Sequence, residues 1–365
     1  MENNPMKIAD LMEGAYNCCI SWGNVKKGEE VLIITDTNCD FRNAQAISSV
    51  CQQVGATVTT AVIPPQELPN QEPSKAVAEA MKVADIVFAP LYYTISHTTA
   101  RFDACNNYNT RFIGMYASTD TQGLASKGAK FPAEIIFKVS QKVAKQWTSG
   151  KRIHITCDKG TDVSGDITNP DENVVGWHGT AAPLGSFAEG ADSWMNKFGN
   201  FAGGFGVVGV WPGWSAEGVM YYDAAHTFCG RLQNPLKFTI EKGRVKKIEG
   251  ATPEIVDFFE KLPNRFGPDS HHIAEFMIGL NPWTRLNFDD PTHMEAHRHA
   301  GGLHTAVGMS VDRDRTVNPG IHLDQYIVEP NIFIDDEPCV EKGKLLVYYK
   351  DPEVLELLDK HGITL

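Results

Sequence analysis

A change of hydrophobic period part-way along the chain constrains the fold more than any other feature. Up to about residue 160, short apolar stretches alternate with amphipathic segments of helical period. Strands are predicted at 30–35, 57–63, 85–89, 111–116 and 152–157, and helices at 41–54, 74–83, 98–108 and 133–147. Strands separated by helices of this length form a parallel sheet that is covered on both faces. Residues 1–160 are therefore predicted to be an α/β domain.

The second part of the chain has a different pattern. Residues 161–206 are rich in Gly, Asp, Asn and Ser, which is typical of a boundary or a long functional loop. Beyond them, 238–240 and 245–248 flank a turn as a hairpin would, and a short helix is predicted at 253–262. Further strands are predicted around 274–280, 304–308, 321–328 and 332–335. Residues 161–365 are therefore predicted to be an α+β domain with mostly antiparallel strands.

The composition narrows the classes of partner. A net charge of -12 argues against nucleic acid or an anionic membrane, since both bind basic patches. No apolar run approaches the roughly 18 residues that cross a bilayer, and the first residues lack the basic end and apolar core of a signal peptide. The eight cysteines include no C-x-x-C pair, which favours reduced thiols over a disulfide framework. We expect a cytoplasmic protein that binds a small-molecule substrate and forms a homo-oligomer.

One glycine motif is not interpreted as a nucleotide site. Residues 204–209 match G-x-G-x-x-G, the pattern of dinucleotide-binding loops. That pattern requires a strand that turns into a helix, whose N-terminus meets the pyrophosphate. Trp211, Pro212 and Gly213 follow at once, so no helix is expected to begin there.

Histidine is concentrated in one segment of the second domain. Seven of the twelve histidines lie within 271–322, where an even distribution would place about two. They are His271, His272, His293, His297, His299, His304 and His322. Neutral imidazole is the commonest metal ligand, so this concentration indicates a metal site.

Four side chains of this segment are the predicted ligands. His322 and Asp324 alternate with an apolar residue on a predicted strand, so both project from one face. Glu275 is a lone acid in an apolar strand, where a carboxylate is costly unless a cation neutralises it. His304 is a single polar group among glycines and apolar residues. Each alone is more often an ordinary hydrogen-bonded residue, but together they predict convergence on one divalent ion.

The motifs around these residues resemble known enzymes. I-A-E-x-x-I-G-L-N-P at 273–282, G-x-H-x-A-x-G at 302–308 and H-L-D at 322–324 resemble the metal-binding part of the aminopeptidase T type of thermophilic aminopeptidases. The same layout is similar to the family of 2,5-dihydroxypyridine 5,6-dioxygenases, mononuclear iron enzymes. The similarity to the dioxygenases runs along most of the chain and includes T-I-S-H-T at 94–98.

The peptidase resemblance implies a two-metal site with three glutamates, two histidines and an aspartate. Glu275, His304, His322 and Asp324 match four of these ligands. The other two glutamates correspond to Val207 and His299, and a nearby tyrosine corresponds to Val311. A second divalent ion would lack anionic ligands, so we predict one ion per chain, Fe²⁺, Zn²⁺ or Mn²⁺.

The dioxygenase resemblance implies a site of two histidines and one carboxylate. His322 and Asp324 match its second and third ligands, but its first histidine corresponds to Glu275. His304 would restore the count of two histidines, a set that suits Fe(II) and oxygen. The alternative, two carboxylates with two histidines, suits a Lewis-acid ion that activates water.

His97 is the predicted contribution of the first domain to a cleft between the domains. It opens a predicted helix at the carboxyl end of a parallel strand, where α/β sheets bind ligands. The dioxygenase resemblance implies a general acid/base there, and the alternative is a residue that caps the helix or packs.

These observations favour a metal-dependent, aminopeptidase-like hydrolase that cleaves an amide or related C–N bond of a small substrate. Metal-activated water would attack, and His97 or His299 would move protons. The alternatives are an Fe(II) ring-cleaving dioxygenase of a hydroxylated N-heterocycle and a non-enzymatic metal-binding protein. The roles of His271, His272 and His297 stay open.

Overall fold

The computed structural model describes residues 7–67, 69–116, 122–167, 198–201, 207–209, 215–225, 230–286, 288, 295–310 and 316–365. The chain divides into two compact units, Met1–Phe137 with Ala181–Phe205 and Lys138–Thr180 with Gly206–Leu365. Within the described residues, no helix has the length and apolar character needed to span a membrane.

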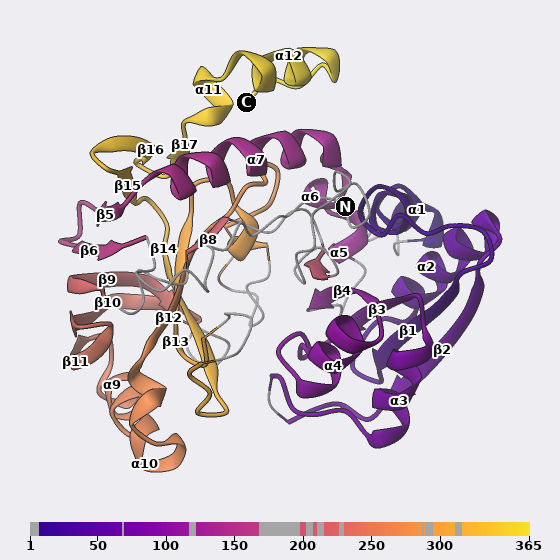
Figure 1. Cartoon of the computed structure of the whole chain (residues 1–365), viewed down its shortest axis with the longest axis horizontal. Coiled ribbons are helices and arrows are strands. Elements are labelled where there is room, and N and C mark those ends of the chain that lie inside the picture. Colours follow the sequence, from indigo (N-terminus) through magenta and orange to yellow (C-terminus); the bar gives the residue numbers. More distant parts are fainter. Residues whose placement is uncertain are drawn as a thin grey trace, which may run out of the picture. The chain divides into compact units, whose positions relative to one another are not determined.

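The first unit is built on a parallel sheet with the strand order β2-β1-β3-β4-β7. The strands are β1 (Glu30–Asp36), β2 (Thr57–Ile63), β3 (Ile86–Leu91), β4 (Arg111–Tyr116) and β7 (Phe198–Asn200). β3 is buried along its whole length and β1 from Val31 onwards, as expected for parallel strands covered on both faces (Figure 1). The α/β prediction for this part of the chain is confirmed.

The helices of this unit begin at polar residues that cap them. The side chains of Asp40, Ser74 and Thr98 accept hydrogen bonds from the first turns of α2 (Phe41–Val54), α3 (Lys75–Val83) and α4 (Thr99–Asn107). α2 ends at Gly55, whose φ of 95° favours glycine. α1 (Ile8–Tyr16), which continues as a π-helix at Asn17–Trp22, was not predicted, and neither were the short α5 (Gln122–Ala125) and α6 (Lys127–Lys130).

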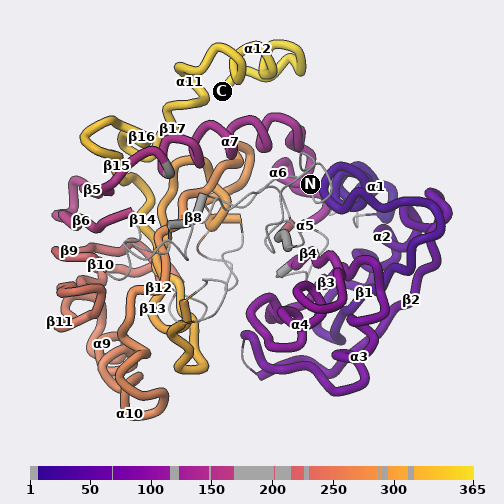
Figure 2. Tube along the Cα trace, in the orientation of Figure 1, coloured from indigo at the N-terminus to yellow at the C-terminus, as the bar shows by residue number. Residues whose placement is uncertain are grey.

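One strand expected in the parallel sheet belongs elsewhere. β5 (Arg152–Thr156) follows α7 (Ala133–Ser149) and pairs antiparallel with β6 (Asp162–Asp166) and β15 (Asn331–Ile334). Figure 2 shows the magenta β5 beside the yellow β15. Only alternate residues of β5, Ile153 and Ile155, are buried, which is typical of an antiparallel strand with one face on the core. The prediction that 152–157 extends the parallel sheet is therefore wrong.

The second unit is dominated by a large antiparallel sheet. Its described strands follow the order β17-β16-β15-β5-β6-β9-β14-β13-β12-β8, and the hairpin of β10 and β11 pairs with β9. The further strands are β8 (Val207–Gly209), β9 (Glu217–Ala225), β10 (Gly230–Glu241), β11 (Arg244–Gly250), β12 (Ile273–Ile278), β13 (Leu303–Gly308), β14 (His322–Ile327), β16 (Glu337–Glu341) and β17 (Lys344–Leu345). The predicted hairpin and the mostly antiparallel α+β class are confirmed.

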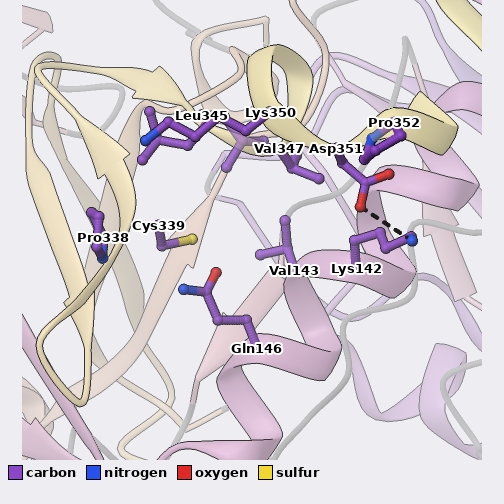
Figure 3. A pocket seen from close by; sticks show the side chains of 11 residues that line it. Lys142, Val143, Gln146, Pro338, Cys339, Leu345, Val347, Lys350, Asp351 and Pro352 are labelled. Atoms are coloured by element: carbon purple, nitrogen blue, oxygen red, sulfur yellow. Dashed lines mark ion pairs between the residues drawn. The ribbon is translucent and has the colours of Figure 1, made fainter. Parts of the chain in front are cut away.

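Short helices complete the second unit. α9 (Pro253–Glu260) corresponds to the helix predicted at 253–262, and α10 (Leu262–Phe266) follows it. α11 (Val347–Lys350) and α12 (Pro352–Lys360) lie beside α7 (Figure 1), where Lys142 pairs with Asp351 at 3.1 Å (Figure 3). A cavity of about 330 Å³ lies between α7 and this segment, with Val143 and Cys339 among its lining residues (Figure 3).

Candidate metal centre

The register of three neighbouring strands places the predicted ligands on one face. Glu275 on β12 pairs with Ala306 on β13, and Ala306 pairs in turn with Asp324 on β14. Directly paired residues point to the same side of a sheet, so the two carboxylates face the same way with a small alanine between them. His322 follows on the same face of β14, opposite Gly308. The three strands thus bring acids that are far apart in sequence to one buried point.

His322 stands between the two carboxylates. Its Nε2 lies 3.2 Å from Glu275 Oε1 and 3.1 Å from Asp324 Oδ1. The donor atoms of Glu275, His322 and Asp324 all lie within 4.8 Å of one another. This nitrogen and two oxygens from separate side chains are a compact set of ligands for a divalent cation.

The other ring nitrogen of His322 fixes the ring. Nδ1 donates to the backbone carbonyl of Met309 over 2.7 Å, which turns Nε2 towards the carboxylates. Metal-binding histidines commonly have this arrangement, because a carbonyl behind the ring sets both its orientation and its tautomer.

The electrostatics of the cluster favour a positive charge at its centre. Burial lowers the pKa of His322, but the negative charges of Asp324 and Glu275 outweigh burial and raise that pKa well above its usual value. Burial likewise raises the pKa of Glu275, yet the hydrogen bonds with His304 and His322 lower it to about 2. The pKa of Asp324 also falls well below its usual value, because the effect of burial is outweighed by His322 and His297. Both acids are therefore ionised at neutral pH.

One oxygen of Asp324 supports the fit of a metal ion directly. Oδ1 is buried and accepts no hydrogen bond, although His322 Nε2 is 3.1 Å away. A buried carboxylate oxygen without a hydrogen bond is costly, and a cation between Oδ1, Nε2 and Glu275 would satisfy it. The residues present fit a divalent ion.

A second group of donors shares Asp324. His297, His304 and Asp324 offer ligand atoms within 4.8 Å of one another. His304 Nε2 lies 3.3 Å from Glu275 Oε1, and His297 Nε2 lies 2.8 Å from Asp324 Oδ2. The predicted ligands Glu275, His304, His322 and Asp324 are thus brought into one connected cluster, in two overlapping triads.

His297 was left without a role by the sequence. It comes from a single 3₁₀ turn, Ala296–Arg298, and not from a strand, so no strand period pointed to it. Burial lowers the pKa of His297 to about 3, which leaves the ring neutral at physiological pH. The closeness of His297 to His299 in the histidine-rich segment was the only signal available.

The proposed proton carriers lie outside both donor groups. His299 Nδ1 is 2.8 Å from the carbonyl of Thr284, and burial lowers the pKa of its ring. α4, which follows His97 in the sequence, is capped by Thr98. The alternative that His97 caps α4 is therefore wrong. The catalytic roles of His97 and His299 stay predictions.

The other residues singled out in the sequence do not belong to the two donor groups, or lie outside the described residues. His271 Nε2 contacts the carbonyl of Phe259 at 2.8 Å, away from the cluster. Val311 lies outside the described residues, as do residues 204–206 of the glycine motif, whereas Val207–Gly209 forms strand β8 next to β12.

Solved structures share this fold. 2,5-Dihydroxypyridine dioxygenase from Pseudomonas putida matches with a TM-score of 0.70 and 16% identity, covering 96% of this chain and 99% of that one. Wild-type AmpT from Thermus thermophilus matches with a TM-score of 0.68 and 13% identity, covering 93% of this chain and 99% of that one. At sequence identities this low, the two structures show that the fold is shared and nothing about function. A search of curated proteins found no match.

The family comparison corrects the functional expectation. The model of the 2,5-dihydroxypyridine 5,6-dioxygenase family matches residues 11–347, nearly the whole chain. The expectation of an aminopeptidase-like hydrolase is therefore wrong, because the family match along the chain favours the dioxygenases. This chain belongs to the 2,5-dihydroxypyridine 5,6-dioxygenase family.

Proposed function

We propose that this protein is a metal-dependent ring-cleaving dioxygenase whose substrate is a hydroxylated N-heterocycle of the dihydroxypyridine class. Family membership supports the reaction and the substrate class. The observation that carries the metal centre is the convergence of Glu275, His322 and the unsatisfied Oδ1 of Asp324 at one buried point.

The proposed ligands are Glu275, His322 and Asp324, with His304 as the fourth. Two imidazoles and two carboxylates make a mixed nitrogen and oxygen set that suits Fe(II). A bound Fe(II) would supply the redox chemistry with dioxygen that side chains alone lack.

The charges favour a single ion. Glu275 and Asp324 are both ionised and balance one divalent cation. The two triads share Asp324, so a second divalent ion would add two positive charges without a further described carboxylate in the cluster. Two divalent ions a few ångströms apart in a buried site would repel strongly.

Proton transfer is assigned to histidines outside the cluster. His299 Nδ1 donates to the carbonyl of Thr284 and burial favours the neutral ring, so Nε2 carries the lone pair that would accept a proton from a substrate hydroxyl. His97, with its half-buried side chain, is the second proposed acid/base, positioned by the hydrogen bond from its backbone N–H to Asn70 Oδ1. Groups of this kind contribute about 10²–10⁴-fold to rates.

Oxygen uptake tests this proposal. Purified protein reconstituted with Fe(II) should consume dioxygen when 2,5-dihydroxypyridine is added, and His322→Ala should not. His154→Ala is a matched control, because this half-exposed histidine also pairs with a carboxylate, Asp162, at 2.9 Å. No uptake with any dihydroxypyridine by iron-loaded protein would reject the proposal.

A further inference from the structure

We propose that His297 is a positioning residue of the metal centre, which holds Asp324 so that only Oδ1 faces the ion. The inference rests on the metal site proposed above. His297 itself does not bind the ion.

The two oxygens of Asp324 have different surroundings. Oδ2 lies 2.8 Å from His297 Nε2 in a buried hydrogen bond. Oδ1 accepts no hydrogen bond and lies 3.1 Å from His322 Nε2, on the side of Glu275. A carboxylate held by one oxygen presents the other as a single ligand atom, so the His297 contact sets how Asp324 binds a cation.

The ionised carboxylate of Asp324 decides which ring nitrogen of His297 carries the hydrogen. Tyr326 Oη lies 3.2 Å from His297 Nδ1 and 2.7 Å from Nε2. A neutral imidazole has one N–H, and the ionised Asp324 only accepts. Nε2 therefore donates to Asp324 Oδ2 and Nδ1 carries the lone pair, while the Tyr326 hydroxyl lies nearer to Nε2 than to Nδ1. Tyr326 thus contacts the same ring nitrogen that holds Asp324.

Packing holds the ring in place. The His297 ring meets the His304 ring edge to face at 4.6 Å and the Tyr326 ring at 4.9 Å. His297 is 8% exposed and Tyr326 3% exposed, and Tyr326 packs with Ala296 and Phe288 in a buried cluster. A ring fixed in this way loses little further freedom when it holds Asp324, which makes it an efficient positioning group.

The alternative is that His297 binds an ion directly. Its Nε2 would then have to give up the hydrogen it donates to Asp324. The triad of His297, His304 and Asp324 also contains one carboxylate, whereas that of Glu275, His322 and Asp324 contains two. The ion therefore favours the second triad, and His297 acts through Asp324.

Cobalt binding tests the inference without catalysis. Co(II), a spectroscopic substitute for Fe(II), is titrated into metal-free wild type, His297→Ala, His297→Gln and Tyr326→Phe. Removal of a residue that supports a ligand typically weakens metal affinity about 10–100-fold, which we expect for His297→Ala. His297→Gln keeps an N–H donor and should recover most of the loss. Tyr326→Phe should weaken binding less than His297→Ala.

His154→Gln is the matched control, since it changes another histidine–carboxylate pair of the same sheet and should leave cobalt affinity unchanged. X-ray absorption of the cobalt forms counts the imidazole ligands, and wild type and His297→Gln should give the same number. The inference is overturned if His297→Ala binds cobalt as tightly as wild type, or if His297→Gln loses one imidazole. Should His297→Ala not fold, the Gln and Tyr326→Phe variants decide by the same readouts. Wild type that binds no cobalt would instead reject the metal centre itself.

Discussion

The parallel sheet of the first unit and the strands β12, β13 and β14 of the second are both buried, but they bury different chemistry. β1 and β3 bury apolar side chains, such as Ile33 and Phe88, at 0% exposure. β12–β14 are buried at every position, yet they carry carboxylates and imidazoles. Burying these groups costs free energy unless a partner compensates, so the second region needs compensating partners that the apolar side chains of the first do not.

Two buried aspartates sharpen this contrast. Asp36, at the end of β1, accepts hydrogen bonds from the backbone N–H groups of Asn38 and Tyr92, each at 2.8 Å. Asp324, on β14, keeps one oxygen without a hydrogen bond. The first carboxylate is satisfied by the protein and the second is left for a cation. Burial of an acid alone is therefore not a sign of a metal site, whereas an unsatisfied oxygen beside other donors is.

The largest effect is expected at His322. His322→Ala removes the ligand between the two carboxylates and should abolish most metal binding, with affinity reduced by at least about 100-fold. Elemental analysis after purification and dialysis measures this. Full metal content in the variant would mean that the ion binds elsewhere.

A large kinetic effect without loss of metal is expected in the first unit. His97→Ala should lower kcat by about 10²–10⁴-fold if His97 is a general acid/base. Metal content and Tm should stay near those of wild type, as they should for His154→Ala. A lower Tm with near-normal turnover would show that His97 has a packing role instead.

Replacing each of the two aspartates by asparagine should affect a different property, stability for Asp36 and metal content for Asp324. Asp36→Asn should lower the free energy of unfolding by about 1–3 kcal/mol, because one of the two backbone N–H groups loses its acceptor. Its metal content should not change. Asp324→Asn should lose metal, since the ligand charge is gone. Chemical denaturation and elemental analysis of both variants test this, and a loss of metal in Asp36→Asn would contradict the distinction.

The smallest expected effect is on how the free energy of unfolding of the metal-free protein depends on pH. The folded-state pKa of Glu275 is about 2, below its usual 4.5, so its ionised form stabilises the fold above about pH 4.5. That contribution is lost as the pH falls towards 2. The stability difference between wild type and Glu275→Gln should therefore be smaller at about pH 3 than at about pH 6 in urea unfolding. A difference that does not change with pH would argue against ionised Glu275 in the metal-free state.

The sequence predicted those parts of the molecule that local rules control. Helices with clear caps, such as α2 after Asp40, and the hairpin of β10 and β11 follow from short-range patterns. The convergence of the proposed ligands on β12, β13 and β14 was predictable because polar residues interrupt apolar strands and consecutive strands pair as neighbours. The place of β5 was not, because one of its two partners, β15, lies far along the chain.

Two aspects of the site lay beyond the sequence. His297 reaches the cluster from a 3₁₀ turn, which has no period to reveal the direction of its side chain. The choice between hydrolase and dioxygenase was also wrong, because Glu275, His322 and Asp324 suit either water activation or iron chemistry.

The central claim is that the shared face of β12, β13 and β14 holds one divalent ion. A crystal structure of the iron-loaded protein, with anomalous data collected at the iron edge, tests it most directly. The account predicts one anomalous peak per chain, at about 2.0–2.2 Å from Glu275 Oε1, His322 Nε2, Asp324 Oδ1 and His304 Nε2. A peak bound by other residues, or no peak in protein that contains iron by elemental analysis, would contradict it.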